Sequence, residues 1–251
     1  MIISVCNEKG GSGKTTIALN LAVKLGLLKE DTLLIDADPQ ANASSGLGID
    51  VENVEIGTYQ ILEHSNKPEE SVVPTSAPNV WLIPAHIDLV AIEIELVDKE
   101  NREYMLKQAL SEIKEEYDYI IIDSPPSLGL LTINSFTAAD EIIIPLQAQF
   151  LAMQGLAKLV EVVEKIKSRL NKGLKIGGVF ITQYDGRKVL NRDVFETINE
   201  HFKSEVFKTK IRDNIALAEA PAQGMDIFRY NAKSNGAEDY MELAKEILKR
   251  K

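Results

Sequence analysis

Short runs of β-branched residues alternate along the chain with longer stretches of helical periodicity, and this alternation constrains the fold more than any other feature. The runs that predict strands span residues 2–6, 32–35, 81–83, 119–122, 142–144 and 176–181. The stretches that predict helices span residues 14–28, 102–116, 152–170 and 237–249. Such alternation is typical of βαβ units. We therefore predict one doubly wound α/β domain over residues 1–251, with a mostly parallel sheet, helices on both faces and one mobile loop at 63–78.

Composition excludes several classes of protein. A hydrophobic fraction of 45% with 26% charged residues is ordinary for a globular domain with a sizeable core. The sequence has no apolar run long enough to span a bilayer, and Met1 leads into I-I-S-V-C without the regions of a signal peptide. We therefore expect a cytoplasmic protein. One cysteine, Cys6, and three scattered histidines predict neither an intrachain disulfide nor a zinc site.

Charge is segregated along the chain. The whole sequence has a net charge of −10, which argues against a nucleic-acid partner. Residues 1–150 hold 9 basic and 24 acidic side chains, whereas residues 151–251 hold 19 basic and 14 acidic ones. A basic second half suggests a face that binds a polyanion, although a solvated basic surface explains the counts as well.

A glycine-rich turn, N-E-K-G-G-S-G-K-T-T at residues 7–16, follows the first predicted strand and opens the first predicted helix. Such a turn aims backbone N–H groups at one point, where the helix dipole also favours negative charge. It predicts a phosphate site, with Lys14 reaching the β- and γ-phosphates and the Thr15 hydroxyl holding Mg²⁺. The strict pattern G-x-x-x-x-G-K-[ST] fails at Glu8, and an additional lysine, Lys9, stands at the mouth of the loop.

Three aspartates follow predicted strands. Asp36 and Asp38 come directly after the second strand, and Asp123 ends another buried strand. The carboxyl ends of parallel strands share one edge of the sheet, where ligands of open α/β folds bind. Asp123 has the usual position of a carboxylate that holds magnesium through its waters. Any one of the three is as readily a turn residue; all three beside the loop favour a nucleotide site.

Together these segments resemble the ParA/Soj/MinD family of deviant Walker-A ATPases, most closely its ParA/Soj partition branch. The resemblance spans nearly the whole chain. Its motifs are K-G-G-S-G-K-T-T (9–16), L-L-I-D-A-D-P-Q-A-N (33–42), Y-D-Y-I-I-I-D-S-P-P (117–126), I-I-P-L-Q-A-Q-F-L-A-M-Q-G-L (143–156), Y-D-G-R (184–187), L-A-E-A-P (217–221) and G-A-E-D-Y-M-E-L-A (236–244).

The resemblance implies a homodimer switch that binds ATP with Mg²⁺ and hydrolyses the ATP slowly. Lys9 would reach the phosphates of the ATP bound to the partner subunit, and Lys14 would contact the phosphates of the ATP bound to its own subunit. Asp38 would position the attacking water. Thr15, Asp36 and Asp123 would hold the metal or its water shell. The remaining ATP contacts implied are Gly10, Gly11, Ser12, Gly13, Thr16 and Asn214, together with Arg212, which stands where the family has a proline.

The resemblance also implies partners: nonspecific DNA for the ATP dimer, and a centromere-bound ParB-like protein that stimulates hydrolysis. Arg187 matches a basic position linked to DNA binding, and we expect Lys188, Lys208, Lys210 and Arg212 to join it. The family's I-P-R-N-V-R is I-R-D-N-I-A here, so that Asp213 and Ala216 replace two arginines. This departure weakens the expectation of DNA binding.

Other functions share the same nucleotide motifs. A MinD-like membrane cycle requires a terminal amphipathic helix; the stripe of Tyr240, Leu243 and Ile247 predicts a core-facing helix instead, because it lacks Phe and Trp. An iron–sulfur reductase requires bridging cysteines, and Cys6 falls inside a strand. An ATPase that positions some other cargo remains open. We expect plasmid or chromosome segregation without the membrane as a partner.

Overall fold

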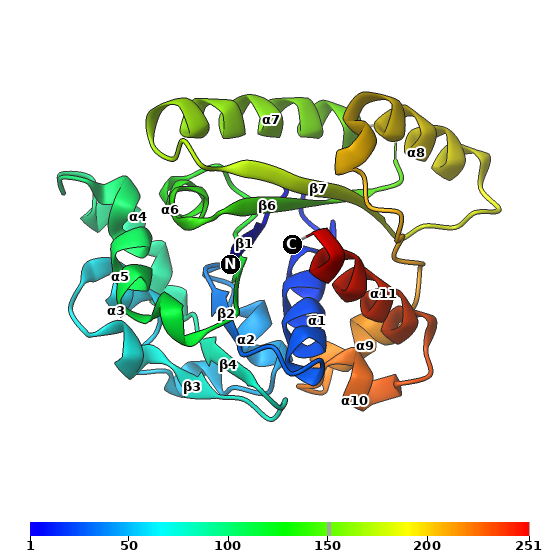
Figure 1. Cartoon of the computed structure of the whole chain (residues 1–251). Coiled ribbons are helices and arrows are strands. Elements are labelled where there is room, and N and C mark those ends of the chain that lie inside the picture. The colour runs from blue at the N-terminus through cyan, green and yellow to red at the C-terminus, as the bar shows by residue number, and fades with distance from the viewer. Residues whose placement is uncertain (150–151, 251) are drawn as a thin grey trace.

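The computed structural model describes residues 1–149 and 152–250. Within these residues seven strands form one sheet in the order β3-β4-β2-β5-β1-β6-β7 (Figure 1). The pair β3–β4 is antiparallel, and every other neighbouring pair is parallel. The strands are β1 (Ile2–Val5), β2 (Thr32–Asp36), β3 (Val73–Pro74), β4 (Val80–Ile83), β5 (Tyr119–Asp123), β6 (Glu141–Gln147) and β7 (Lys175–Thr182).

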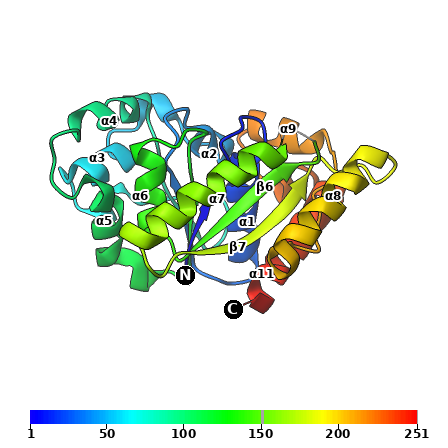
Figure 2. The same cartoon turned by 90° about the horizontal axis from the view of Figure 1, so that it is seen from above.

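Helices cover both faces of the sheet, which confirms the predicted doubly wound fold. The first face carries α3 (Thr58–Glu63), α5 (Met105–Ile113), α6 (Leu130–Ala138), α7 (Ala152–Arg169) and α8 (Val189–Phe202), with α4 (Ile92–Glu95) packed beside α3. The second face carries α1 (Lys14–Leu27), α2 (Asn42–Gly46), α9 (Ala216–Ala222), α10 (Ile227–Asn231) and α11 (Asn235–Arg250). Figure 2, seen from above, shows α7 running across β6 and β7.

Every strand of the sheet except β3 contributes to two hydrophobic cores, because successive side chains point to opposite faces. On β5, Ile120 and Ile122 join the core under α5, α6 and α7, whereas Tyr119 and Ile121 join the core under α1 and α11. Burial on both sides explains why the strands read as continuous apolar runs. Cys6 lies in the first core, and burial raises the pKa of its thiol to about 12. The thiol is therefore protonated at neutral pH.

The predicted helix at 102–116 is an α-helix flanked at both ends by a 3₁₀ turn. Residues Arg102–Tyr104 and Lys114–Glu116 form 3₁₀ turns around α5. The expected apolar face is buried: Met105, Leu106, Ala109, Leu110 and Ile113 are each at most 3% exposed. The final helix likewise buries Tyr240, Leu243 and Ile247 against the core of the second face, as expected. None of the described helices combines the length and apolar character that crossing a bilayer requires.

The sequence-based prediction differs from the structure at one loop and at several helices. The stretch 63–78 is not simply a loop: it contains a 3₁₀ helix, Pro68–Ser71, and the edge strand β3, whose Val73 pairs with Leu82 of β4. Pairing with β4 supplies the order that the local composition does not predict. The helices α2, α3, α4, α6, α8, α9 and α10 are absent from the predicted set. Most of them are short, and α8, the longest, buries only two apolar residues, Val194 and Ile198.

The register of the central strands gathers the acidic residues at one edge. Asp123 at the end of β5 lies opposite both Val5 on β1 and Asp36 on β2. The chain leaves β1 just beyond Val5 and enters the glycine-rich turn. The turn and the aspartates that follow β2 and β5 therefore meet at the carboxyl edge of the sheet.

Candidate active site

The glycine-rich turn between β1 and α1 needs glycine for its backbone conformation. Gly11 has a φ of 73° and Gly13 a φ of 89°, values in the left-handed region that side chains rarely allow. Gly13 directly precedes α1, whose first N–H groups have no carbonyl partner within the helix. These N–H groups and the helix dipole make the turn suited to phosphate.

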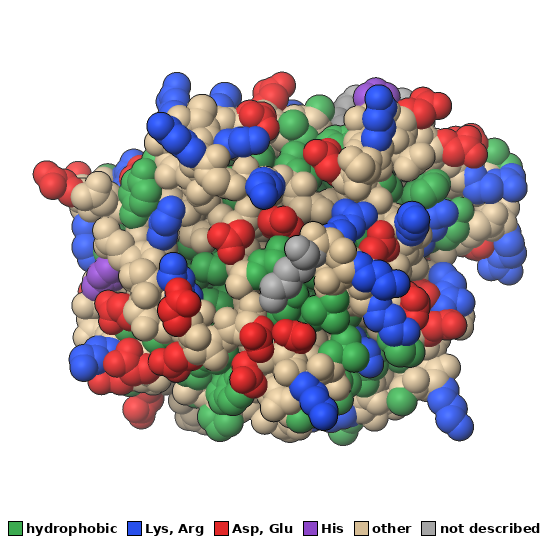
Figure 3. Space-filling model, viewed as in Figure 1, with side chains coloured by type: hydrophobic (Ala, Val, Ile, Leu, Met, Phe, Trp, Pro, Cys, Tyr) green, Lys and Arg blue, Asp and Glu red, His purple; other side chains and the backbone are tan. Residues whose placement is uncertain are grey.

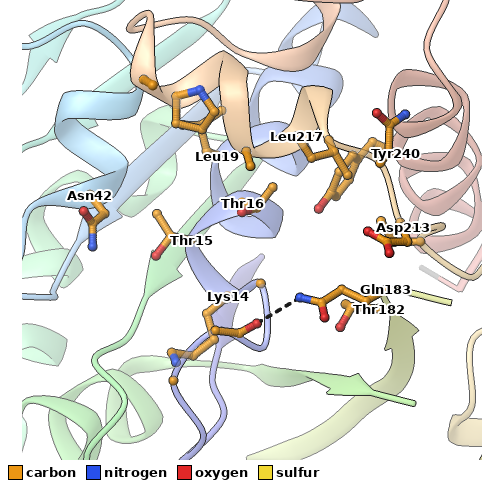
Figure 4. Close-up of a pocket in the computed structure, with 18 of the residues that line it drawn as sticks. Lys14, Thr15, Thr16, Leu19, Asn42, Thr182, Gln183, Asp213, Leu217 and Tyr240 are labelled. Atoms are coloured by element: carbon orange, nitrogen blue, oxygen red, sulfur yellow. Dashed lines mark hydrogen bonds between the residues drawn. The ribbon is translucent and has the colours of Figure 1, made fainter. Parts of the chain in front are cut away.

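Polar side chains at the ends of β6 and β7 hold this turn in place. Gln147 donates a hydrogen bond from Nε2 to the carbonyl of Gly11 at 2.6 Å, and Gln183 donates to the same carbonyl at 3.2 Å, drawn as a dashed line in Figure 4. The Thr182 hydroxyl donates to the carbonyl of Ser12 at 3.0 Å. Sequence reasoning missed these three residues. The available signal was a polar side chain at the end of each of two apolar strands.

The two lysines of the turn have different surroundings. Lys14 is 6% exposed, and its Nζ donates to the carbonyl of Lys9 at 3.3 Å. Burial lowers the pKa of Lys14, while the nearby carboxylates of Asp123 and Asp38 oppose that shift. The Lys9 side chain lies at the surface, where its Nζ donates to Oε1 of Gln149 at 2.7 Å. Lys14 is thus a fixed internal cation, and Lys9 is accessible from outside.

The three aspartates are all buried, yet their partners differ. Asp36 accepts hydrogen bonds from Ser44 and from the backbone N–H of Asp38, and burial raises its pKa to about 6 despite these bonds. Asp38 accepts a hydrogen bond from the backbone N–H of Gln40 at 2.9 Å and lines the cavity described below.

Asp123 is the least satisfied of the three. Both of its carboxylate oxygens are fully buried, and neither makes a well-formed hydrogen bond to the described residues. Burial and the neighbouring Asp36 raise its pKa well above the usual range, against the lowering effect of the Thr15 hydroxyl. A buried carboxylate without compensation is costly, so this one is suited to a cation that restores its charge balance. Oxygen donors such as those of Asp123 and Thr15 match the preference of Mg²⁺.

A cavity of about 740 Å³ opens above the turn. Of the predicted site residues, the following line it: Gly10, Gly11, Gly13, Lys14, Thr15, Thr16, Asp38, Arg212 and Asn214. The other four do not line it: Lys9 and Ser12 belong to the turn, and Asp36 and Asp123 are buried at the ends of β2 and β5. In Figure 4, Lys14 and Thr15 lie at one end, and Asp213 and Tyr240 lie toward the other.

The residues predicted to bind DNA are only partly free. Arg187, Lys188 and Lys208 are exposed, although Arg187 makes a two-pronged ion pair with Asp185 at 2.9 Å. Lys210 lies 3.6 Å from the centre of the Phe195 ring, and Arg212 pairs with Asp239 and Glu238. Figure 3 shows Lys and Arg gathered on the side where α8 lies, and Asp and Glu gathered around α3 and β3.

Within the motif 143–156, positions 150 and 151 lie outside the described residues.

Comparison with known proteins agrees with this geometry. A family model described as an AAA domain matches residues 1–176. The sporulation initiation inhibitor protein Soj of Bacillus subtilis is 46% identical over 246 residues, which cover 98% of this chain and 97% of that protein. The chromosome partitioning protein ParA of Myxococcus xanthus is 43% identical over 249 residues, which cover 99% of this chain and 88% of that protein.

A solved structure is similar over the same length. The Mycobacterium smegmatis protein named cobyrinic acid a,c-diamide synthase, with a bound ATP analogue and magnesium, has a TM-score of 0.88 and 32% identity. The match covers 99% of this chain and 94% of that one. That structure holds the two ligands that the turn and the aspartates of the present chain are suited to bind.

Proposed function

The chain belongs to the ParA/Soj family of P-loop ATPases, and we propose that it is a partition ATPase that uses its ATP state to dimerise and to bind DNA. Residues 1–251 would form one ATPase domain, cytoplasmic and associated with the nucleoid. The single observation that carries the proposal is the presence, beside one glycine turn, of a buried Lys14 and of a buried Asp123 whose oxygens lack a well-formed hydrogen bond to the described residues. These two side chains are suited to the phosphates and the cation of Mg²⁺–ATP.

Within the site, each residue has a distinct task. The N–H groups of residues 10–16 and the Nζ of Lys14 bind the phosphates. Thr15 and Asp123 would hold Mg²⁺, directly or through water, while Asp36 supports them from beneath. The metal supplies charge neutralisation on the phosphates. Asp38, which lines the cavity, orients the attacking water.

The position of Lys9 supports the proposed dimerisation. A lysine that lies at the surface beside the phosphate turn is available to a second copy's nucleotide. Its charge would complete neutralisation of the γ-phosphate only after two subunits meet, which links ATP binding to dimerisation and keeps hydrolysis by the monomer slow.

DNA binding is proposed for the exposed cations near α8, namely Arg187, Lys188 and Lys208. Lys210 and Arg212 belong to the same region but already have partners within the chain. Dimerisation would present two copies of this surface to one polyanion. Nonspecific affinity is then expected at about 10⁻⁴ to 10⁻⁶ M at physiological salt. A ParB-like activator would return the dimer to monomers by stimulating hydrolysis.

The test combines light scattering with fluorescence anisotropy. The purified chain is measured with ATP and Mg²⁺, with a nonhydrolysable ATP analogue, with ADP and without nucleotide, using duplexes of random sequence across a salt series. The proposal predicts a dimer and salt-sensitive DNA binding with ATP or the analogue. Binding that ignores nucleotide and salt would contradict it and would favour an ATPase that positions another cargo.

The membrane-cycling alternative receives no support from the terminal helix. The apolar stripe of α11, with Tyr240, Leu243 and Ile247, is buried against α1 and the sheet. A stripe that forms part of the core is not available to a lipid surface without partial unfolding.

A further inference from the structure

The Arg212 side chain is 39% exposed, and its guanidinium is bound to residues in the first turns of α11. Its Nε donates to Oδ1 of Asp239 at 3.0 Å and its Nη2 donates to the same oxygen at 2.6 Å. Its backbone N–H donates to Oδ2 of Asp239 at 2.8 Å, and Nη2 also reaches Glu238 at 2.6 Å. Asp239 is only 7% exposed. Side chain and backbone of one residue are thus joined to one buried carboxylate.

This contact fixes a loop that lines the nucleotide cavity. Residues 212–215 all line it, and so does Tyr240, the residue after Asp239. On its other side the loop is held by β7 and the chain that follows it: Ile211 donates to the carbonyl of Ile181 at 2.9 Å, and Asp213 donates to that of Tyr184 at 3.3 Å. The Arg212–Asp239 pair supplies the attachment to α11.

The phosphate turn lies at the other end of the same cavity (Figure 4). A nucleotide with its phosphates on that turn therefore points its base toward residues 213–215 and Tyr240. Bidentate arginine–carboxylate pairs fix geometry as well as charge. Asp239 and Glu238 together raise the pKa of Arg212 further above its usual range, so the guanidinium stays charged.

We propose that Arg212 is a positioning residue: its ion pair with Asp239 holds the loop 212–215 in the shape that receives the base, and it thereby sets the base-dependent part of nucleotide affinity. The inference rests on the proposed function, because it takes ATP as the ligand. It assigns Arg212 neither to the phosphates nor to DNA.

The test compares two ligands that share phosphates and differ in the base. Calorimetry measures the binding of ATP and of inorganic tripolyphosphate, each with Mg²⁺, to the wild type and to Arg212→Met, Asp239→Asn and Arg212→Lys. The first two variants should bind ATP roughly tenfold more weakly and tripolyphosphate within about twofold of the wild type. Lysine keeps the charge and loses the fork, so Arg212→Lys should fall between.

Controls separate positioning from general damage. Arg102→Met makes the same chemical change in an ion pair of similar exposure outside the cavity and should leave the affinity for both ligands unchanged. The double variant Arg212→Met/Asp239→Asn should lose no more ATP affinity than either single variant, because the two residues act as one ion pair. If Arg212→Met does not fold, as judged by circular dichroism, Asp239→Asn and Arg212→Lys carry the comparison.

An equal loss of affinity for ATP and for tripolyphosphate, or an unchanged ATP affinity in the folded variants, would overturn the inference. Failure of the proposed function looks different: the wild type itself would not bind ATP, whatever the state of the Arg212–Asp239 pair.

Discussion

Asp36 accepts two hydrogen bonds from Ser44, one from the backbone N–H at 2.8 Å and one from the hydroxyl at 2.7 Å. Ser44 lies in α2, so this contact ties the end of β2 to the helix that follows it. The carboxylate is fully buried, and the cost of burying its charge outweighs the bonds that stabilise it. Asp36 therefore fixes the start of the segment that carries Asp38, and its raised pKa leads to a prediction about stability and pH.

We predict that stability falls as the pH rises through about 6, because burial raises the pKa of Asp36 to about 6. An unfolded aspartate titrates near ~4, so the folded state binds the proton more tightly, and this contribution is complete below pH ~4. It amounts to about 3 kcal/mol, lost between pH ~4 and ~7. Asp36→Asn should flatten the change, since it also removes a charge that raises the pKa of Asp123.

Urea unfolding without nucleotide, repeated from pH 4 to pH 8, checks this prediction. The exposed Asp98→Asn is the matched control, and its pH dependence should follow that of the wild type. Parallel curves for the wild type and Asp36→Asn would show that Asp36 is not the titrating group.

Lys14→Ala should abolish ATP binding. Lys14 is the buried cation of the turn, and its charge is the principal point charge available to the β- and γ-phosphates. Titration calorimetry with Mg²⁺–ATP measures the loss directly. Lys107→Ala, an exposed lysine on α5, should bind like the wild type. Affinity near that of the wild type in Lys14→Ala would overturn the phosphate-site assignment.

Lys9→Ala should leave ATP binding by the monomer intact and prevent ATP-induced dimerisation and turnover. The reason is that the Lys9 side chain lies at the surface beside the turn, held only by Gln149 among the described residues. Light scattering with a nonhydrolysable analogue decides the matter. A normal dimer would refute the role of Lys9 across the subunit boundary.

Asp38→Ala should dimerise and remain in the ATP state. Orienting the attacking water contributes to the transition state far more than to ground-state binding. Phosphate release should fall by at least about 100-fold while light scattering with ATP still reports a dimer. Should hydrolysis persist at the wild-type rate, Asp38 has a structural role and does not orient the attacking water.

Arg187→Ala should weaken DNA binding equally on all sequences and reduce the log–log salt slope by about one, because each phosphate contact contributes about −0.9 to that slope. Its side chain is 91% exposed, so release from Asp185 costs little. Fluorescence anisotropy of the ATP dimer on random duplexes measures both quantities, with Lys107→Ala as the control. An unchanged slope would remove Arg187 from the DNA surface.

Local sequence determined the strands and the phosphate turn. Runs such as residues 119–122 are apolar throughout because both faces of their sheet are buried. This pattern identifies a buried strand without knowledge of the strands beside it. Gly11 and Gly13 predict the turn because glycine readily adopts the left-handed backbone conformation that other residues rarely adopt. Lys14, Thr15, Asp38 and Asn214 were expected in one site from sequence motifs and resemblance, and all four line one cavity.

Only the tertiary structure decided which polar groups satisfy one another across long separations in the chain. Gln147 and Thr182 support the turn from positions more than a hundred residues away, and nothing in their local sequence specifies that contact. From the sequence, Arg212 was expected to contact ATP or DNA. In the structure it forms an ion pair with Asp239 instead. The sequence determines which charge a side chain carries, but the packing of the fold determines which residue neutralises that charge. The reason is that a buried charge without a partner is costly, and its neighbours come from segments that only the fold brings together.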